Sequence, residues 1–585
     1  MSEHTDIASP PAAEAGWFGP EERPCFGWLH RTTRPSGTAL VIVPPFGYEA
    51  VCAQRTLRHL AERAAGAGIM AVRFDLDGCG DSYGDDFDPG RLDAWLTSIN
   101  DACALARANG ATRLVLAGVR LGATLATLAA RTRDDVVALA LVNPVRKGAA
   151  WLREARALQA ALALPAAPQP AADDDTQEVV GFAITPETRE SIASIDLATL
   201  AHAPAPAILV VERDDMPGDA RLSGHLRDLG AAVETVRLPG YAEMMLDPHE
   251  TQVPHALIDH TVAWTARLAG NASMHAPTAT RLRDSVTVEH AGRRQRWRCV
   301  RIEPGLFGIL TEPESGADGR SVLLFNAGGI ARVGPNRLYP ALATRLAATG
   351  ARVLRIDLSS IGDSATQPGE VENRVYHARA TGDVAAVVAW VRIHGATTVL
   401  AGGLCSGGYH AMQAAFAGSD IDVLLMINPL TFDYREGSGK QIALRRDSRR
   451  YDRMVRNRSA WRKLLRGEVS LLRIVRVLSW RAVAALKPRT LDLMRTLHVP
   501  MPHDLGNRFS ALARRGVRIE LVLAHDDPGG MMLAEQAGNT VPALQRTGAM
   551  HIRTLDGPDH SFTALWMQPL LLDAAFEALS RRSAT

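Results

Sequence analysis

The sequence predicts an α/β protein that folds as two consecutive, doubly wound and mainly parallel sheets, each with a lid insertion. Short apolar runs alternate with helical stretches such as LRHLAERAAGAG and LYPALATRLAATG, a pattern typical of parallel strands joined by crossover helices. One series of landmarks occurs twice along the chain. The chain has 585 residues, whereas single hydrophobic cores rarely grow beyond about 250–300 residues. Two domains are therefore expected.

The repeat consists of six landmarks that recur in the same order. The pairs are TALVIVPPFG near 40 and SVLLFNAGG near 321, AGIMAVRFDLDGCGDS (67–82) and GARVLRIDLSSIGDS (350–364), TRLVLAGVRLGA (112–123) and TTVLAGGLCSGG (397–408), VVALALVNP (136–144) and IDVLLMINP (421–429), PAILVVERDDMPG (206–218) and RIELVLAHDDPGG (518–530), and RLPGYAEM (237–244) and TLDGPDHS (554–561). We expect domains at 20–270 and 285–585, joined by the segment between them. A dinucleotide-binding fold is the structural alternative, but G-x-G-x-x-G follows the first strand of neither half.

Composition excludes several classes of protein. Hydrophobic residues make up 46% and charged residues 22%, and the formal net charge of +2 gives no global field that would attract nucleic acid. The six cysteines lack CxxC pairs and metal-ligand spacing, so reduced thiols and no metal site are expected. No secretory signal begins the chain, and no apolar run of about 20 residues could span a bilayer. We expect a cytoplasmic protein without a cofactor.

The segment Gly403-Leu404-Cys405-Ser406-Gly407 has the G-x-nucleophile-x-G pattern of a nucleophile elbow, with Cys405 at its centre. Ser406 is the competing nucleophile, but its register would require glycine in place of Leu404. An elbow places its nucleophile at the N-terminus of a helix, where the helix dipole favours a thiolate. The alternative is a small buried cysteine at a tight turn.

The order of the landmarks resembles the α/β-hydrolase fold over nearly the whole chain. That order is an oxyanion turn, an elbow, an acid after a late strand and a histidine after the last strand. Each half separately resembles a group of bacterial α/β-hydrolase-like proteins that recur near biosynthetic gene clusters; the shared motifs are PPFGYE…CAQRTLRHLAE with G-V-R-L-G, and NAGG…R.GPNRLY. A cysteine at the elbow resembles dienelactone hydrolase.

The resemblance implies roles for residues of the second half. His560, after the last strand, would act as the base, and Asp527 would orient its imidazole, with Asp526 as the alternative acid. The amides of Ser406 and Gly328, with Gly329 close by, would form the oxyanion hole. Arg332, Asn336 and Arg337 could reach over the pocket, although Asn336 and Arg337 could equally cap the next helix.

The first half has a different set of residues at the same landmarks. Arg120 takes the nucleophile position, Glu243 the histidine position and Asp215 the acid position. A guanidinium is no nucleophile at neutral pH, so this half is expected to be inert in acyl transfer. We expect a vestigial site in which Arg120 and Glu243 form an ion pair, with Asp215 as a further partner. The alternative is a site where Arg120 grips an anion.

Each half carries an insertion where this fold places its lid, at about 145–200 and about 433–515. The first insertion contains the stretch LPAAPQPAADDDTQE, whose Ala, Pro and Asp content is typical of a flexible loop. The second contains RRDSRRYDRMVRNRSAWRKLLRG, in which arginine predominates. An Arg-rich helical cap near an acyl-transfer site favours attraction to an acidic acyl carrier protein or a coenzyme A thioester. The alternative is a solvated helix face. DNA binding is not expected, because no recognition motif accompanies the charge.

These observations predict a cysteine-dependent acyl hydrolase or acyltransferase, thioesterase-like or esterase-like, with one active site in the second half. Cys405 would attack an ester or thioester and form an acyl-enzyme, which water, an alcohol or an amine would resolve. A non-catalytic binding or scaffold protein with two relic hydrolase folds is the alternative. Retention of both His560 and Asp527 argues against that alternative.

Overall fold

The computed structural model describes residues 13–33, 35–162, 175–269, 282–434 and 504–581. The chain divides into two compact units; the first extends to Val300 and includes Ile309–Ser315, and the second begins at Arg301. Most of the expected linker, the stretch LPAAPQPAADD and most of the Arg-rich insertion lie outside the described residues. Each unit is described by itself below.

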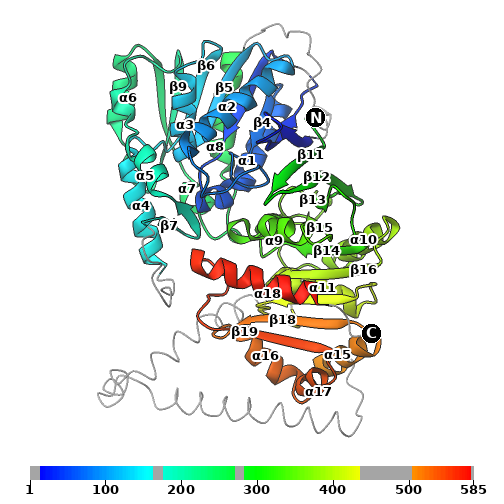
Figure 1. Ribbon diagram of the computed structural model, residues 1–585. Helices are drawn as coiled ribbons and strands as arrows, with labels where there is room; N and C mark the ends of the chain where they lie inside the picture. Colours follow the sequence, from blue (N-terminus) through cyan, green and yellow to red (C-terminus); the bar gives the residue numbers. More distant parts are fainter. Residues whose placement is uncertain (1–12, 34, 163–174, 270–281, 435–503, 582–585) are drawn as a thin grey trace, which may run out of the picture. The chain divides into compact units, whose positions relative to one another are not determined.

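The first sheet has eight strands in the order β1-β2-β4-β3-β5-β6-β9-β10 (Figure 1). Strands β1 and β2 are antiparallel, β2 is antiparallel to β4, and all later pairings are parallel. The bounds are β1 (Glu14–Phe18), β2 (Cys25–His30), β3 (Thr38–Val43), β4 (Met70–Phe74), β5 (Arg113–Val119), β6 (Val136–Val142), β9 (Ala207–Arg213) and β10 (Ala232–Leu238).

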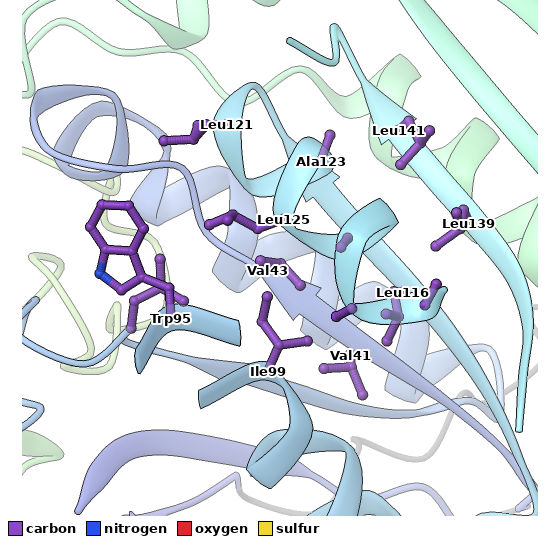
Figure 2. Close-up of a cluster of buried hydrophobic side chains, with 14 of the residues drawn as sticks. Val41, Val43, Trp95, Ile99, Leu116, Leu121, Ala123, Leu125, Leu139 and Leu141 are labelled. Carbon is purple, nitrogen blue, oxygen red and sulfur yellow. The ribbon is translucent and has the colours of Figure 1, made fainter. Parts of the chain in front are cut away.

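Helices cover both faces of this sheet because its strands present apolar side chains alternately to each face. On β3, Val41 and Val43 face one core, whereas Leu40 and Ile42 face the other. Figure 2 shows the first of these cores, in which Trp95 and Ile99 of one helix and Leu121 and Leu125 of another lie against strand residues. The helices are α1 (Tyr48–Gly66) and α8 (His255–Ala269) on one face, and α2 (Arg91–Ala108) and α3 (Leu121–Ala130) on the other.

The second sheet has nine strands in the order β11-β12-β13-β15-β14-β16-β17-β18-β19. From β15 to β19 every pairing is parallel. The bounds are β11 (Ser285–His290), β12 (Arg293–Ile302), β13 (Leu306–Pro313), β14 (Arg320–Phe325), β15 (Arg352–Asp357), β16 (Thr398–Leu404), β17 (Val423–Ile427), β18 (Arg518–Ala524) and β19 (Met550–Leu555). The parallel part of each sheet therefore has one and the same strand order, β4-β3-β5-β6-β9-β10 and β15-β14-β16-β17-β18-β19. This confirms the predicted fold class.

The second sheet is likewise joined by crossover helices. Helix α9 packs against α18, and α10 packs against α11 (Figure 1). The bounds are α9 (Leu338–Ala347), α10 (Ala380–Ile393), α11 (Ser406–Phe416), α15 (Leu505–Arg514), α16 (Pro528–Ala537), α17 (Thr540–Arg546) and α18 (Gln568–Ser580).

The insertion of the first half is partly described. Between β6 and β9 the chain forms two helices, α4 (Gly148–Ala161) and α5 (Pro186–Ala193), and a two-stranded antiparallel sheet of β7 (Gln177–Val179) and β8 (Phe182–Ile184). Trp151 and Leu152 of α4 and Phe182 of β8 join the core under α2 and α3. This insertion is therefore packed on its own unit over the residues that are described.

The Gly-Asp-Ser turns of the repeat have one hydrogen-bond pattern in both sheets. The Ser82 hydroxyl donates to the Asp75 carbonyl and accepts from the Phe26 amide, and the Ser364 hydroxyl does the same between Asp357 and Phe307. Each serine thus ties the strand before the turn to a neighbouring strand. The recurrence of this landmark has a structural cause.

Close strand packing around Gly402 yields a first prediction. A Cβ at Gly402 of β16 would lie 1.9 Å from the carbonyl oxygen of Leu425 in β17, so Gly402→Ala must displace the neighbouring strand. We expect a loss of about 2–3 kcal/mol in the free energy of unfolding, as overpacking typically gives. The matched control is Gly382→Ala in α10, where a Cβ would meet nothing within 4 Å and where alanine is expected to stabilise by up to about 1 kcal/mol. Denaturation of both variants checks this; equal effects would contradict the packing argument.

Candidate active site

Cys405 lies between the last residue of β16 and the first residue of α11, at the carboxyl edge of the parallel strands. Its backbone has φ 54° and ψ −114°, a positive-φ conformation that residues other than glycine rarely adopt. Its amide donates to the Ile427 carbonyl at 2.8 Å. Residues at this edge of an open α/β sheet are the ones that generally contact ligands.

Glycines on both sides let the elbow approach its neighbours. A Cβ at Gly407 would lie 2.4 Å from the Phe325 carbonyl oxygen, and a Cβ at Gly403 would lie 2.7 Å from the Tyr339 hydroxyl. That hydroxyl accepts a hydrogen bond from the Leu404 amide at 2.8 Å and donates to the Phe325 carbonyl at 3.1 Å. The turn that carries Cys405 is therefore packed against the end of β14.

His560 and Asp527 are in direct contact. The Asp527 Oδ2 atom lies 2.6 Å from His560 Nδ1, while its Oδ1 atom accepts from the Gly529 amide at 3.0 Å. Asp527 is buried at the N-cap of α16, so both of its oxygens have fixed directions. Asp526 is exposed instead. Of the two acids that the sequence offered, the structure places Asp527 on the histidine.

The charge state of His560 depends on both of its neighbours. Burial favours the neutral imidazole, but the negative charge of Cys405, together with hydrogen bonds to Asp527 and Cys405, outweighs burial and raises the pKa of His560 to about 10. Because Nδ1 faces Asp527, Nε2 is the nitrogen available to Cys405. The raised pKa favours the imidazolium form of His560 at neutral pH.

Asn428 supports the histidine loop, a role that the sequence did not suggest. Its side-chain amide donates to the His560 carbonyl at 2.8 Å, and its Oδ1 accepts from the Ala524 amide at 2.7 Å. Asn428 thereby joins the ends of β17 and β18 to the backbone of His560. The signal was present as the repeated Asn-Pro landmark, to which no function was assigned.

The amide of Gly328 does not have the orientation expected of an oxyanion donor. It donates to the Ser406 hydroxyl at 2.9 Å, and that hydroxyl donates to the Asn326 carbonyl at 2.9 Å. Ser406 thus binds the loop after β14 through its side chain, and the Gly328 amide is already engaged by the Ser406 hydroxyl. The preceding residue, Ala327, is buried, and its amide has no acceptor within the described part of the chain. The Ala327 amide is therefore a second candidate donor, which the sequence analysis did not name.

Arg332 does not line a pocket, which corrects the sequence-based expectation. It is 3% exposed, and its Nη1 atom lies 2.9 Å from Asp357 Oδ2 and 2.8 Å from Asp363 Oδ2. Its amide also donates to Asp357, at 2.6 Å. Two carboxylates neutralise the guanidinium, so it braces the turn after β15. Arg337 is partly exposed at the N-cap of α9, with a left-handed backbone.

Tyr376 is a neighbour of Cys405 that sequence reasoning did not identify. Its hydroxyl oxygen lies 3.8 Å from Cys405 Sγ. The residue lies between the Gly-Asp-Ser turn after β15 and the start of α10, a stretch that carries none of the repeated landmarks. No motif could have pointed to it, since its position depends on how that segment folds back onto α11.

The first elbow has the same backbone and different partners. Arg120 has φ 54° at the N-cap of α3, but its Nε donates to Glu49 Oε1 at 2.9 Å and its Nη2 pairs with Glu154. The predicted ion pair with Glu243 is wrong. In the short helix α7 (Tyr241–Met244), Tyr241 is buried whereas Glu243 is exposed, so the helix turns Glu243 toward solvent.

Asp215 also has a different partner from the one expected. It forms an ion pair with Arg213, the last residue of β9, and is exposed to solvent. The Arg213 guanidinium in turn lies 4.4 Å from the centre of the Tyr241 ring. Asp215 is therefore bound by a neighbour two residues away, and Arg120 takes its counter-charge from α1 and α4 instead.

The described ranges contain neither a cluster of metal ligands nor a membrane-spanning helix. No group of three or more His, Cys, Asp or Glu residues there is arranged to hold a metal ion. None of the helices in those ranges combines the length and the hydropathy needed to cross a bilayer.

No family model and no curated protein matches the chain. Among solved structures, it is similar to DcsB in complex with a substrate analogue, at 14% identity and a TM-score of 0.33, over 45% of this chain and 100% of that chain. Est1E from Butyrivibrio proteoclasticus with bound ferulic acid is similar at 19% identity and a TM-score of 0.32, over 43% of this chain and 95% of that chain. The α/β hydrolase GrgF from Penicillium sp. sh18 is similar at 14% identity and a TM-score of 0.32, over 44% of this chain and 98% of that chain.

The partners of Arg120 yield the second prediction. Arg120→Met removes the counter-charge of Glu49, whose side chain is 21% exposed, and stranding one member of such a pair typically costs about 3–5 kcal/mol when it is buried. We expect a loss near the lower end of that range in the stability of the first unit. Glu243→Gln, at an exposed position, is the control and should change stability by less than about 0.5 kcal/mol. Thermal unfolding of the two variants decides between the partners.

Proposed function

We propose that the chain is a cysteine-dependent acyl-transfer enzyme, in which Cys405 forms an acyl-enzyme with an ester or thioester substrate. The observation that carries the proposal is the contact series Asp527–His560–Cys405 at a strand-to-helix elbow. A nucleophile, a base in contact with it and an acid that orients the base are the parts that nucleophilic acyl transfer requires.

The first half of the reaction follows from the charges at the site. The Cys405 thiolate attacks the carbonyl carbon, and the carbonyl π electrons move onto oxygen to give a tetrahedral oxyanion. The amide of Ser406, at the N-terminus of α11, is the first candidate donor to that oxyanion, and the amide of Ala327 is the second. Collapse expels the leaving group, which takes the Nε2 proton of His560, and an acyl-Cys405 thioester remains.

In the second half of the reaction, His560 acts first as a base, and Cys405 becomes the leaving group. Neutral His560 removes a proton from water, an alcohol or an amine as that group attacks the thioester carbonyl. When the second tetrahedral intermediate collapses, the thiolate of Cys405 leaves and the imidazolium of His560 is restored next to it. Asp527 keeps Nδ1 protonated throughout both halves, so Nε2 always faces the reacting atoms. Hydrolysis and transfer to an acceptor use the same residues and differ only in the second nucleophile.

The first half of the chain is proposed to have no acyl-transfer activity. Arg120 stands at the elbow with Glu49 as counter-ion, and the buried residues of α7 are Tyr241 and Met244, of which only Tyr241 is titratable. Burial raises the pKa of Tyr241 to about 12, and the opposing effect of the nearby Arg120 charge is smaller. A phenol with that pKa keeps its proton at neutral pH and therefore cannot act as a general base there.

A trapping experiment tests the proposed nucleophile. Incubation with an acyl N-acetylcysteamine thioester should add one acyl group to the intact protein, and peptide mapping should place it on Cys405. Cys405→Ala should show no adduct and no turnover, whereas Cys299→Ala, at a partly exposed cysteine, should label normally. His560→Ala should reduce turnover by at least about 10²-fold, because the general base is lost. Normal turnover by Cys405→Ala would refute the proposal, whereas a wild-type protein that forms no adduct and shows no turnover would favour a scaffold role for both halves.

The acyl donor is proposed to carry negative charge, as a coenzyme A thioester or an acidic acyl carrier protein does. Within residues 433–515 the basic side chains far outnumber the acidic ones. Attraction between exposed charges is screened beyond about 8–10 Å at physiological ionic strength. KM for an acyl-coenzyme A should therefore rise with salt concentration, while KM for the same acyl group on uncharged N-acetylcysteamine should not. Equal salt responses for the two donors would indicate that this charge is only a solvated surface.

A further inference from the structure

Tyr376 has a contact that the reaction above does not use. Its hydroxyl oxygen is 3.8 Å from Cys405 Sγ, within hydrogen-bond distance for sulfur, and either atom could donate. His560 contacts the same sulfur. The thiol of Cys405, which is 8% exposed as a residue, therefore lies between an imidazole and a phenol.

The ring of Tyr376 is fixed by contacts that leave its hydroxyl directed at the sulfur. It stacks on Tyr434 with ring centres 4.6 Å apart and planes 15° apart, and it meets the edge of Tyr409 at 5.2 Å and 82°. The backbone before it is anchored as well, because the Val375 carbonyl lies 2.8 Å from His410 Nε2. Such contacts restrict the orientation of an aromatic ring.

Two of the residues that hold Tyr376 in place belong to the helix that begins directly after Cys405. Tyr409 and His410 lie one turn after Cys405 in α11, and the Tyr409 amide donates to the Cys405 carbonyl at 3.3 Å. A shift of α11 would thus move the sulfur together with these two residues, whereas Tyr434 holds the other side of the Tyr376 ring from outside the helix.

We propose that the Tyr376 hydroxyl donates a hydrogen bond to the Cys405 thiolate, which makes Tyr376 a catalytic residue that holds the nucleophile in its charged form together with His560. The inference rests on the proposed function in one respect, namely that Cys405 is the nucleophile. When the sulfur becomes a thioester on acylation it loses its charge, and this hydrogen bond weakens. The Tyr376 hydroxyl therefore stabilises the resting thiolate and the thiolate that leaves during deacylation.

The phenol keeps its proton under the conditions in which the thiolate forms. Burial raises the pKa of Tyr376 well above its ordinary value of 10, and the negative charge of Cys405 raises it further. In a contact between a protonated phenol and a thiolate, the oxygen is the donor. Hydrogen bonds to charged groups are stronger than those between neutral groups, so loss of the hydroxyl should be measurable.

The test is the pH dependence of Cys405 alkylation by iodoacetamide, followed by mass spectrometry of the Cys405 peptide. In Tyr376→Phe, the pH at which alkylation reaches half its maximal rate should rise by about one unit, which corresponds to an about tenfold slower reaction on the acid side. Phenylalanine keeps both ring contacts, and an unchanged unfolding temperature verifies the fold. Tyr376→Leu provides the same loss of the hydroxyl if the first variant is insoluble.

Tyr409→Phe is the matched control, because the Tyr409 hydroxyl accepts from the Tyr434 amide at 3.4 Å rather than contacting the sulfur. Its alkylation profile should coincide with that of the wild type. An unchanged midpoint in Tyr376→Phe, or an equal shift in Tyr409→Phe, would overturn the inference. Alkylation needs no acyl substrate, so a shifted midpoint in a protein that forms no acyl adduct would refute the proposed function and leave the hydrogen bond established.

Discussion

The positive-φ backbone at Cys405 is the constraint on which the rest of the second site depends. A non-glycine residue in a sparsely populated backbone region costs about 1–3 kcal/mol, and here the conformation is enforced by glycines that pack against β14 and by the Tyr339 hydroxyl. It places the sulfur at the N-terminus of α11 and beyond the sheet edge. Every other group in the site, from His560 to Tyr376, is positioned by elements that end at that edge.

Much of this arrangement could be predicted, because it follows from the order of strands along the chain. The glycine spacing identified the elbow, and the landmarks after β18 and β19 identified Asp527 and His560, which the structure places in contact. Their catalytic roles remain predictions. The strand order itself was readable from alternating apolar and helical segments, because a parallel sheet buried on both faces produces that pattern.

The errors concern side chains whose direction is set by local register. Arg120 was assigned to Glu243 because both stand at repeated landmarks, but one helical turn directs Glu243 to solvent. Arg332 was assigned to a pocket because it follows a glycine-rich turn, yet Asp357 and Asp363 enclose it. Gly328 was chosen from the position of a loop, whereas the direction of its amide is decided by the Ser406 hydroxyl. Sequence spacing locates such residues to within a turn and does not determine which way they face.

Arg120 shows that the strained turn is a property of the architecture rather than of catalysis. It has the same φ as Cys405, although it has no nucleophilic task and its guanidinium is neutralised by α1 and α4. The first unit thus preserves an elbow whose geometry any side chain at this position would inherit. A thiol grafted there would have the correct backbone and would find the phenol of Tyr241 where an imidazole is needed. The chemistry proposed for the second elbow therefore depends on the group opposite it, and giving that chemistry to the first elbow would require rebuilding α7 before changing the residue at its centre.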